Sequence, residues 1–174
     1  MRGSDPNAAV YWLARMVEGG EDPRFIARRM VILASEDIGN ANPNALLMAT
    51  TAMQAAQMIG WPESRIILSQ CAIYLACSPK SNSAYMAIGN AQAEVRSSGD
   101  LPVPLHLRNA PTKLMKDIGY GEKYQYSHDF AGHVSDQEFL PEAISGKRLY
   151  EPGDNRKEQE FAAYIKAVWK ERYG

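Results

Sequence analysis

The sequence predicts an all-α protein, with a helical array in its first half and an irregular, wrapped second half. In the first half, apolar residues recur every three to four positions, the spacing that places them on one face of a helix. Asp or Asn before Pro, and Gly further on, punctuate these segments, and such residues start and end helices. The connections are short, so consecutive helices should pack as antiparallel or crossing neighbours.

The first predicted helix begins at Asp5-Pro6 and ends at Gly19-Gly20. Its clearly polar residues form a single stripe of Asn7, Arg15 and Glu18. A helix with one narrow polar stripe is covered by other elements on its remaining faces. We therefore expect this helix to be buried on most sides.

The second predicted helix begins at Asp22-Pro23 and ends at Gly39. This assignment places Glu36 and Asp37 in its last turn, where the negative end of the helix dipole disfavours acids by a few tenths of a kcal/mol or more. Another group must therefore stabilise the two carboxylates. The apolar stripe of the helix consists of Ile26, Met30, Leu33 and Ala34.

Two interpretations of these acids remain open. In the first, Glu36 and Asp37 pair with a cation on a neighbouring helix or cap the next helix. In the second, they form a polar cluster with Arg28 and Arg29 at a contact between subunits. Arg29 and Glu36 are seven residues apart and so share a helix face, but this spacing fits both interpretations.

Three more helices are predicted, from Asn42-Pro43 to Gly60, from Pro62 to Ser78-Pro79, and from about Lys80 to Gly99. Their polar stripes are thin and rich in Ala, Met, Thr and Ser, which indicates close helix contacts on more than one side. Burial in an oligomer and burial in a monomeric core explain this equally well. Their apolar positions include Leu46, Ala49, Met53, Ala56, Leu68, Cys71, Ala72, Leu75, Tyr85, Ile88 and Val95.

The second half changes character. Asp100–His106 contains two alternating prolines, which favour an extended chain. Asn109 is predicted to cap a short helix that ends at Gly119. The Tyr- and Gly-rich segment that follows, to Phe130, is predicted to wrap a surface already formed. One helical turn is predicted within Phe139–Gly146, and the last element is an amphipathic helix over Asn155–Tyr173, with Phe161, Ile165 and Val168 inward and Lys157, Glu160, Lys170 and Glu171 outward.

Length and composition are those of one ordinary domain. The chain has 174 residues and a formal net charge of −1, so no global field attracts it to nucleic acid or to an acidic membrane. Cys71 and Cys77 have no Cys or His at metal-ligand spacing, and we predict that both are reduced core residues of an intracellular protein. No apolar run reaches the ~20 residues that cross a bilayer, and no signal-peptide pattern opens the chain. We expect a soluble, cytoplasmic protein.

The familiar catalytic motifs are absent from the sequence: a Gly-x-x-x-x-Gly-Lys-Ser/Thr phosphate loop, a Gly-x-Gly-x-x-Gly loop and a Gly-x-Ser-x-Gly elbow. His128, Asp129 and His133 are the remaining candidates for a metal site or an acid/base pair, such as that of a small hydrolase. Their spacing matches no metal motif. Loop histidines that form ordinary hydrogen bonds are the competing interpretation.

One stretch interleaves basic and aromatic residues, a pattern that can hold single-stranded nucleic acid by stacking and phosphate contacts. In the competing interpretation, the tyrosines anchor the wrapped segment and the lysines face water. Lys147 and Arg148, further along the chain, belong to the same pattern. The candidate surface for DNA or a protein partner consists of Lys113, Lys116, Tyr120, Lys123, Tyr124 and Tyr126.

Long motifs carry a resemblance to a known family. They are Arg2–Met16, Gly20–Pro23, Ala34–Ala41, Pro79–Asn82, Pro102–Met115 and Tyr126–Asp129. Together they resemble the C-terminal part of the RarA/MgsA group of AAA+ ATPases, the replication-associated recombination proteins, whose eukaryotic relative is the Werner helicase-interacting protein. In that family the Arg2–Asp5 motif lies inside a longer protein, so we expect this chain to be a C-terminal part, with Met1 either native or added.

The resemblance implies an all-α domain related to the clamp-loader collar, which assembles the parent ATPase as a homotetramer. It makes residues 1–20 the tail of the helical segment that follows the ATPase module. Residues 21–174 are then the C-terminal oligomerisation domain, and the two parts pack as one unit. The parent is expected to act at stalled or damaged replication forks, with DNA and single-stranded DNA-binding protein as partners.

The Walker A and Walker B segments and the arginine finger of the family are missing from this sequence. The resemblance therefore assigns ATP and Mg²⁺ to the absent ATPase module and no cofactor to this chain. We predict a non-catalytic oligomerisation domain. The alternative is a docking module for DNA or a replication protein that uses Tyr120–Phe130.

Overall fold

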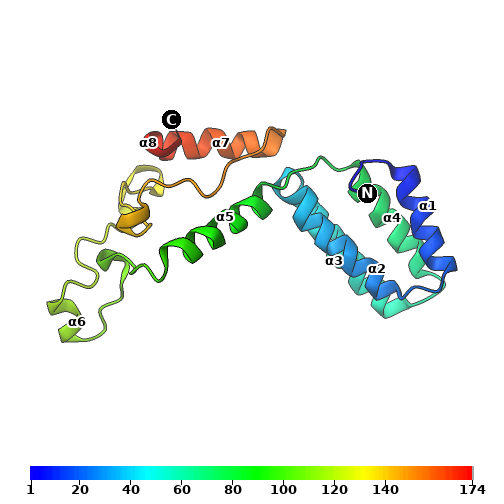
Figure 1. The fold of residues 1–174 in the computed structure, drawn as a ribbon, viewed down its shortest axis with the longest axis horizontal. Helices are drawn as coiled ribbons and strands as arrows, with labels where there is room; N and C mark the ends of the chain where they lie inside the picture. Colours follow the sequence, from blue (N-terminus) through cyan, green and yellow to red (C-terminus); the bar gives the residue numbers. More distant parts are fainter. Residues whose placement is uncertain (174) are drawn as a thin grey trace. The chain divides into compact units, whose positions relative to one another are not determined.

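The computed structural model describes residues 1–173, and these residues form helices and turns without any strand (Figure 1). The all-α prediction is confirmed. The chain divides into two compact units. The first unit joins Met1–Gly89 to Tyr150–Ala162, and the second joins Asn90–Leu149 to the C-terminal stretch from Ala163 onward.

The predicted Asp-Pro helix starts are confirmed. The Asp5 carboxylate accepts hydrogen bonds from the backbone N–H groups of Asn7 and Ala8 at 2.9 and 3.0 Å, and Asp22 accepts from the N–H of Arg24 at 2.8 Å. These contacts satisfy amides that have no partner inside a helix. The helices that begin in the first unit before residue 90 are α1 (Pro6–Glu18), α2 (Pro23–Leu33), α3 (Asn44–Ile59), α4 (Ser64–Cys77) and α5 (Ser83–Ser98).

The core of the first unit forms around α4, which packs against α1, α2 and α3. Leu68, Cys71 and Leu75 of α4 are fully buried. The side of α3 that faces this core consists of small residues, which allow the neighbouring helices to approach closely. These residues are Ala45, Ala49, Ala52 and Ala56.

Two burial predictions are wrong. Helix α1 buries only Ala9 and Leu13, whereas Trp12 is 62% exposed; its contact with the core is one narrow stripe. Cys77 is exposed, unlike Cys71, because it lies at the end of α4 on the face turned away from the core. Burial raises the pKa of the Cys71 thiol to about 11.

The end of the second helix also differs from the prediction. Helix α2 stops at Leu33, and a π-helical turn, η1 (Ala34–Ile38), follows, then the 3-10 turn η2 (Gly39–Ala41). A π turn has more residues than an α turn, so it shifts which side chains share a face. Glu36 and Asp37 therefore lie in η1 and not in the last turn of an α-helix.

The second half has the predicted irregular character. Helix α6 (Lys113–Asp117) is capped by Thr112 and not by Asn109, because the Thr112 hydroxyl accepts from the Met115 N–H. The predicted turn within Phe139–Gly146 is present as η6 (Glu142–Ile144), and the predicted final helix is divided at Trp169. The remaining elements are η3 (Leu105–Leu107), η4 (Ser127–Asp129), η5 (Ala131–His133), α7 (Arg156–Val168) and α8 (Lys170–Tyr173).

Candidate functional site

The Ala34–Ala41 motif, which includes η1, and the Pro79–Asn82 motif, which follows α4, contact each other. The Ser81 N–H donates to the Asp37 carbonyl oxygen at 2.9 Å. Gly39 adopts a φ of +50°, and a Cβ at this position would lie 3.1 Å from the Ser81 carbonyl oxygen. The positive φ and the short distance to Ser81 both require glycine at position 39, since other residues avoid this conformation and would crowd Ser81.

Asn42 has a different role from the predicted helix cap. Its side-chain amide donates to the Tyr74 hydroxyl at 3.1 Å and to the Ser78 hydroxyl at 3.0 Å. Helix α3 begins at Asn44 without a side-chain cap. Asn42 therefore ties the loop before α3 to the last turn of α4.

The most enclosed polar group of this region is the carboxylate of Glu158, which is fully buried. It accepts hydrogen bonds from the hydroxyls of Ser81 (2.5 Å), Ser83 and Tyr150 (3.2 Å), from the Asn155 amide (2.6 Å) and from the Gly153 N–H (3.3 Å). We call these six residues the Glu158 site. Within residues 1–173 no ion pair reaches this carboxylate.

Neutral donors and two helix ends stabilise the charge of Glu158. Burial raises the pKa of this carboxyl, but the hydrogen bonds from the Glu158 site lower it by more, and the pKa lies below its usual range. Ser83 is the first residue of α5, and Glu158 lies in the first turn of α7. Both helix dipoles therefore present their positive ends at the carboxylate.

Sequence reasoning missed Glu158, although a local signal was available. Asn155 and Glu158 have the spacing of a capping box. The Glu158 N–H donates to the Asn155 side chain at 3.0 Å, and the Asn155 amide donates back to Glu158. The signal predicts a helix start but not the burial, since the serines lie more than 70 residues earlier.

Lys80, in the Pro79–Asn82 motif, caps α4. Its ammonium donates to the carbonyl oxygens of Leu75 (3.0 Å), Ala76 (3.2 Å) and Ser78 (2.5 Å). Burial lowers the pKa of Lys80 by more than the charges of Cys77 and Asp37 raise it. The cation satisfies carbonyls that have no partner at the end of a helix.

Lys80→Met is therefore expected to lower the free energy of unfolding by about 1–2 kcal/mol, because it keeps the aliphatic stem and removes the hydrogen bonds of the charged group. Urea denaturation measures this change. Lys116→Met is the matched control, since Lys116 is exposed and its loss should change stability by less than about 0.5 kcal/mol. Equal effects of the two substitutions would contradict the capping role.

The predicted polar cluster is only partly assembled within the chain. Arg2 pairs with Glu36 (3.5 Å) and with Asp37 (2.8 Å), so a cation does stabilise the two acids. Arg28 and Arg29 are exposed on α2 and form no ion pair within residues 1–173. Arg29 and Glu36 are seven residues apart and do not pair, whereas direct ion pairs within a helix join residues three or four apart.

The predicted nucleic-acid surface lies in the second unit, where its residues have different surroundings. Lys113, Lys116, Lys123, Tyr124 and Tyr126 are exposed. Tyr120 is half-buried, because the Arg108 guanidinium lies 5.0 Å from its ring centre and donates to its hydroxyl at 3.0 Å.

The two nearby histidines lie beside this surface. The Tyr126 and His128 rings are 5.1 Å apart between centres, and the His128 and His133 rings are 4.9 Å apart. Both imidazoles and Asp129 are exposed. In the part of the chain that the structure describes, no three His, Cys, Asp or Glu residues are grouped to hold a metal ion.

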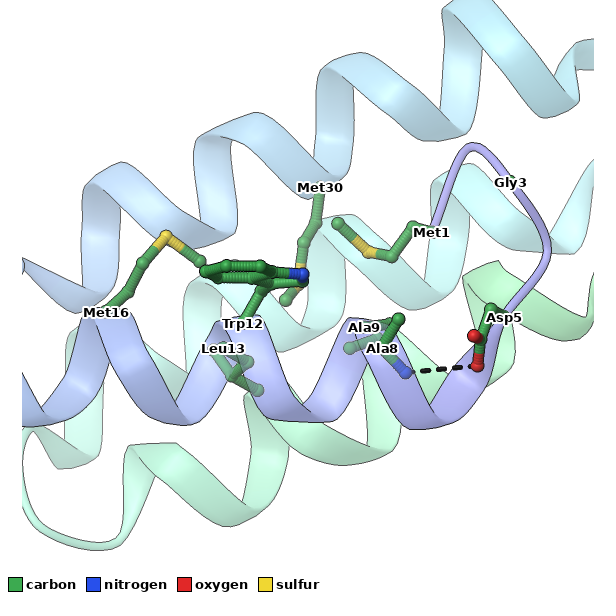
Figure 2. Close-up of a pocket in the computed structure, with 10 residues that line it drawn as sticks. Met1, Gly3, Asp5, Ala8, Ala9, Trp12, Leu13, Met16 and Met30 are labelled. Carbon is green, nitrogen blue, oxygen red and sulfur yellow. Dashed lines mark hydrogen bonds between the residues drawn. The ribbon is translucent and has the colours of Figure 1, made fainter.

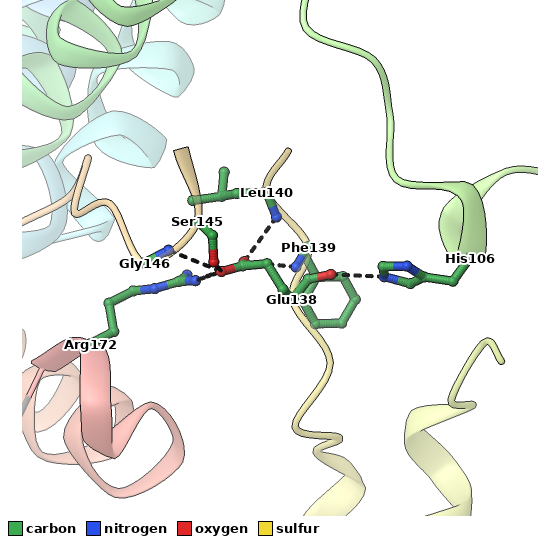
Figure 3. A network of polar contacts seen from close by, with 7 residues as sticks. All are labelled: His106, Glu138, Phe139, Leu140, Ser145, Gly146 and Arg172. Atoms are coloured by element: carbon green, nitrogen blue, oxygen red, sulfur yellow. Dashed lines mark hydrogen bonds and ion pairs between the residues drawn. The ribbon is translucent and has the colours of Figure 1, made fainter. Parts of the chain in front are cut away.

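A second carboxylate, that of Glu138, organises part of the second unit (Figure 3). Arg172 donates to both of its oxygens, at 2.7 and 2.6 Å. Ser145 and the N–H groups of Phe139, Leu140 and Gly146 donate to the same carboxylate at 2.8–3.0 Å. Burial raises the pKa of Glu138, but Arg172 and the other donors outweigh it and hold the pKa well below its usual range.

An apolar cavity of about 190 Å³ lies between α1 and α2 in the first unit. Figure 2 shows the Trp12 indole between the side chains of Met16 and Met30. Leu13 and Ala72 also line the cavity. The exposed side of α1 is therefore apolar, although we predicted that other elements would cover it.

No helix among residues 1–173 is long and apolar enough to cross a membrane.

The family model described as "MgsA AAA+ ATPase C terminal" matches residues 3–169. The chain belongs to this family. The resemblance stated from the motifs is thereby confirmed.

Relatives within the MgsA family support this assignment. Replication-associated recombination protein A of Coxiella burnetii is 49% identical over 153 residues, which are 87% of this chain and 35% of the relative. The protein of the same name from Escherichia coli K12 is 46% identical, with 87% of this chain and 34% of the relative covered. ATPase WRNIP1 of Dictyostelium discoideum is 47% identical over 87% of this chain and 17% of its own length. The chain thus spans about a third or less of these relatives.

Proposed function

We propose that this domain holds the subunits of a replication-associated AAA+ ATPase together as a homo-oligomer, most simply a tetramer, in the manner of the clamp-loader collar. ATP and Mg²⁺ belong, in this proposal, to the ATPase module of the parent, and the domain itself is non-catalytic. The parent acts in replication-coupled repair and recombination at DNA forks. The names of the relatives support the pathway, and the surface of the first unit supports the assembly.

The observation that carries this proposal is the second apolar face of α4. This helix already packs against α1, α2 and α3 through Leu68 and Leu75. Its other face presents Ile66 and Ile73, which are 60% and 43% exposed and are seven residues apart, so they share a side. A helix that is apolar on more than one side is normally buried on those sides, so a further neighbour is expected.

Helices α3 and α5 also carry exposed apolar residues. Leu47 and Met58 of α3 are exposed, and so are Tyr85, Met86 and Ile88 of α5. Only Ser83 of α5 is buried. Large exposed apolar patches mark protein contacts, and obligate contacts typically bury about 2,000 Å² or more. A second copy of the chain supplies that area.

Arg28 and Arg29 belong to the same proposal. Together with Glu36 and Asp37 they are a candidate polar contact between subunits. The arginines are exposed and lack acidic partners within residues 1–173. An acidic partner on a second copy would compensate their charge.

The test is the mass of the 19.3 kDa chain in solution, measured by light scattering across a wide dilution range. We expect a stable multiple of that mass. The double variant Ile66→Lys, Ile73→Lys should be monomeric with an unchanged circular dichroism spectrum, because two ammonium groups would oppose burial of this face.

Leu114→Lys is the matched control, since Leu114 is an exposed aliphatic residue of α6 in the second unit. It should keep the assembled mass. A wild-type chain that stays monomeric at every concentration would overturn the proposal for this domain. If the double variant still assembles, the contact between subunits does not involve this face of α4.

A second candidate function is docking of DNA or of single-stranded DNA-binding protein through Tyr120–Phe130. The specific observation is the set of exposed rings in this segment, including Tyr124 and Tyr126. Lys113, Lys116 and Lys123 complete the candidate surface.

A further inference from the structure

A group of rings faces water in the second unit. Tyr124 and Tyr126 are 49% and 55% exposed, and the rings of Tyr126, His128 and His133 follow one another at 5.1 and 4.9 Å between centres. We call Tyr124, Tyr126, His128 and His133 the ring platform. Aromatic rings of this size are normally used to bury area, so their joint exposure needs a partner.

The backbone under the ring platform is fixed by buried polar groups. Gln137 is buried, and its side chain accepts from the Gln125 N–H at 3.2 Å and donates to the Gln125 carbonyl oxygen at 2.8 Å. It also donates to the buried Ser135 hydroxyl at 3.1 Å. Because Gln125 is held on its inner side, Tyr124 and Tyr126 on either side of it point outward.

Short turns place the two histidines. The Asp129 N–H donates to the Tyr126 carbonyl oxygen at 2.9 Å, and the His133 N–H donates to the Phe130 carbonyl oxygen at 3.0 Å. These bonds form η4 and η5, which carry His128 and His133. The ring platform is thus held in place before any ligand binds, which reduces the entropy cost of binding.

Lysines of α6 and of the segment that carries the platform favour a ligand with both flat rings and negative groups. Lys113, Lys116 and Lys123 are exposed and have no carboxylate partner among the residues that the structure describes. Glu122 and Asp129 lie in the same segment and offset part of this positive charge. Phosphate attraction is therefore modest, and ring stacking should supply much of the affinity.

We propose that the ring platform binds single-stranded nucleic acid by stacking its unpaired bases, while Lys123, Lys113 and Lys116 contact the phosphates. This inference rests on the second candidate function above and names its chemistry. Every base has a flat face, so the site is expected to tolerate different sequences. Paired bases in a duplex do not offer that face, so duplex DNA should bind more weakly.

The experiment uses fluorescence anisotropy with a labelled 20-nucleotide oligo-dT, a matched abasic strand with the same phosphates, and oligo-rU. At low salt we expect oligo-dT to bind at least about fivefold more tightly than the abasic strand, since one stacked base contributes about 1–3 kcal/mol. Comparison of oligo-dT with oligo-rU shows whether DNA or RNA is the better source of the bases.

The matched variants are Tyr126→Ala in the platform and Tyr164→Ala on α7, both of which replace exposed tyrosines. Tyr126→Ala should weaken oligo-dT binding about fivefold or more, and Tyr164→Ala should leave it unchanged. Equal binding of the abasic strand, equal losses in the two variants, or no binding at low salt would each overturn the proposal. Light scattering on the same samples reports assembly separately, so a failure of base binding is distinguishable from a failure of oligomerisation.

Discussion

Glu158→Ala is expected to lower the free energy of unfolding by about 3–4 kcal/mol, which is a large part of the stability of a typical domain. The substitution removes the acceptor from the hydroxyls of Ser81 and Ser83 and from the Asn155 amide. Each enclosed donor that loses its acceptor costs about 1–3 kcal/mol. Denaturation in urea, followed by circular dichroism, measures the loss.

Two further variants separate the carboxylate from the space it fills. Glu158→Gln keeps the size but replaces one acceptor oxygen by a donor, so we expect an intermediate loss of about 2 kcal/mol. Glu160→Gln is the control on the same helix: Glu160 is exposed and, among the residues that the structure describes, pairs with Lys157 alone. Its effect should stay within about 0.5 kcal/mol. Similar losses at positions 158 and 160 would show that the Glu158 site contributes little.

Arg172→Met is expected to lower the free energy of unfolding by about 2–3 kcal/mol at pH 7, because Glu138 loses the charged Nη2 group that donates to both of its oxygens. The folded pKa of Glu138 lies below its usual range. The stability that this carboxylate contributes is therefore present above the unfolded pKa of about 4.3 and is lost as the pH falls through the folded pKa.

Because the folded pKa of Glu138 is lowered, the effect of Arg172→Met should depend on pH. The difference in stability between wild type and Arg172→Met should be largest near neutral pH and should shrink as Glu138 becomes protonated. Lys170→Met, an exposed change in the same short helix, should show no such pH dependence. Urea denaturation at several pH values provides the measurement, and a constant difference down to acidic pH would contradict the role given to Arg172.

Local signals in the sequence predicted much of the helical array. Asp5 and Asp22 cap the first two helices as expected, because a cap depends on residues only two or three positions away. Cys71 was correctly placed in the core from the apolar spacing of α4. The family resemblance came from long motifs and was confirmed by the family model.

The errors concern contacts that depend on distant residues. The π turn at Ala34–Ile38 and the pairing of Glu36 with Arg2 were not predicted, because no helical spacing indicates a partner 34 residues earlier. Helix α1 was expected to be buried on most sides because the prediction counted polar residues rather than neighbours, whereas Trp12 is 62% exposed. The burial of Glu158 required serines far away in the sequence, so its spacing to Asn155 revealed only a helix start.

Within the candidate site, sequence reasoning identified types of residue better than their surroundings. Tyr124, Tyr126 and Lys123 are exposed, which the candidate surface needs, whereas Tyr120 lies half-buried under Arg108. Nothing in the sequence distinguishes these tyrosines from one another. The difference comes from Arg108, which covers Tyr120, and from Gln137, which fixes the backbone between Tyr124 and Tyr126.

The hydrogen bond from Ser81 to Glu158 joins residues 77 positions apart, and this separation has a consequence for synthesis. A ribosome makes the chain from the N-terminus, so the helices of Met1–Gly89 emerge well before the carboxylate that completes their unit. Until residue 158 emerges, the hydroxyls of Ser81 and Ser83 must remain hydrated. The first unit is therefore completed only once Glu158 has been made, although most of its core is made more than 70 residues earlier.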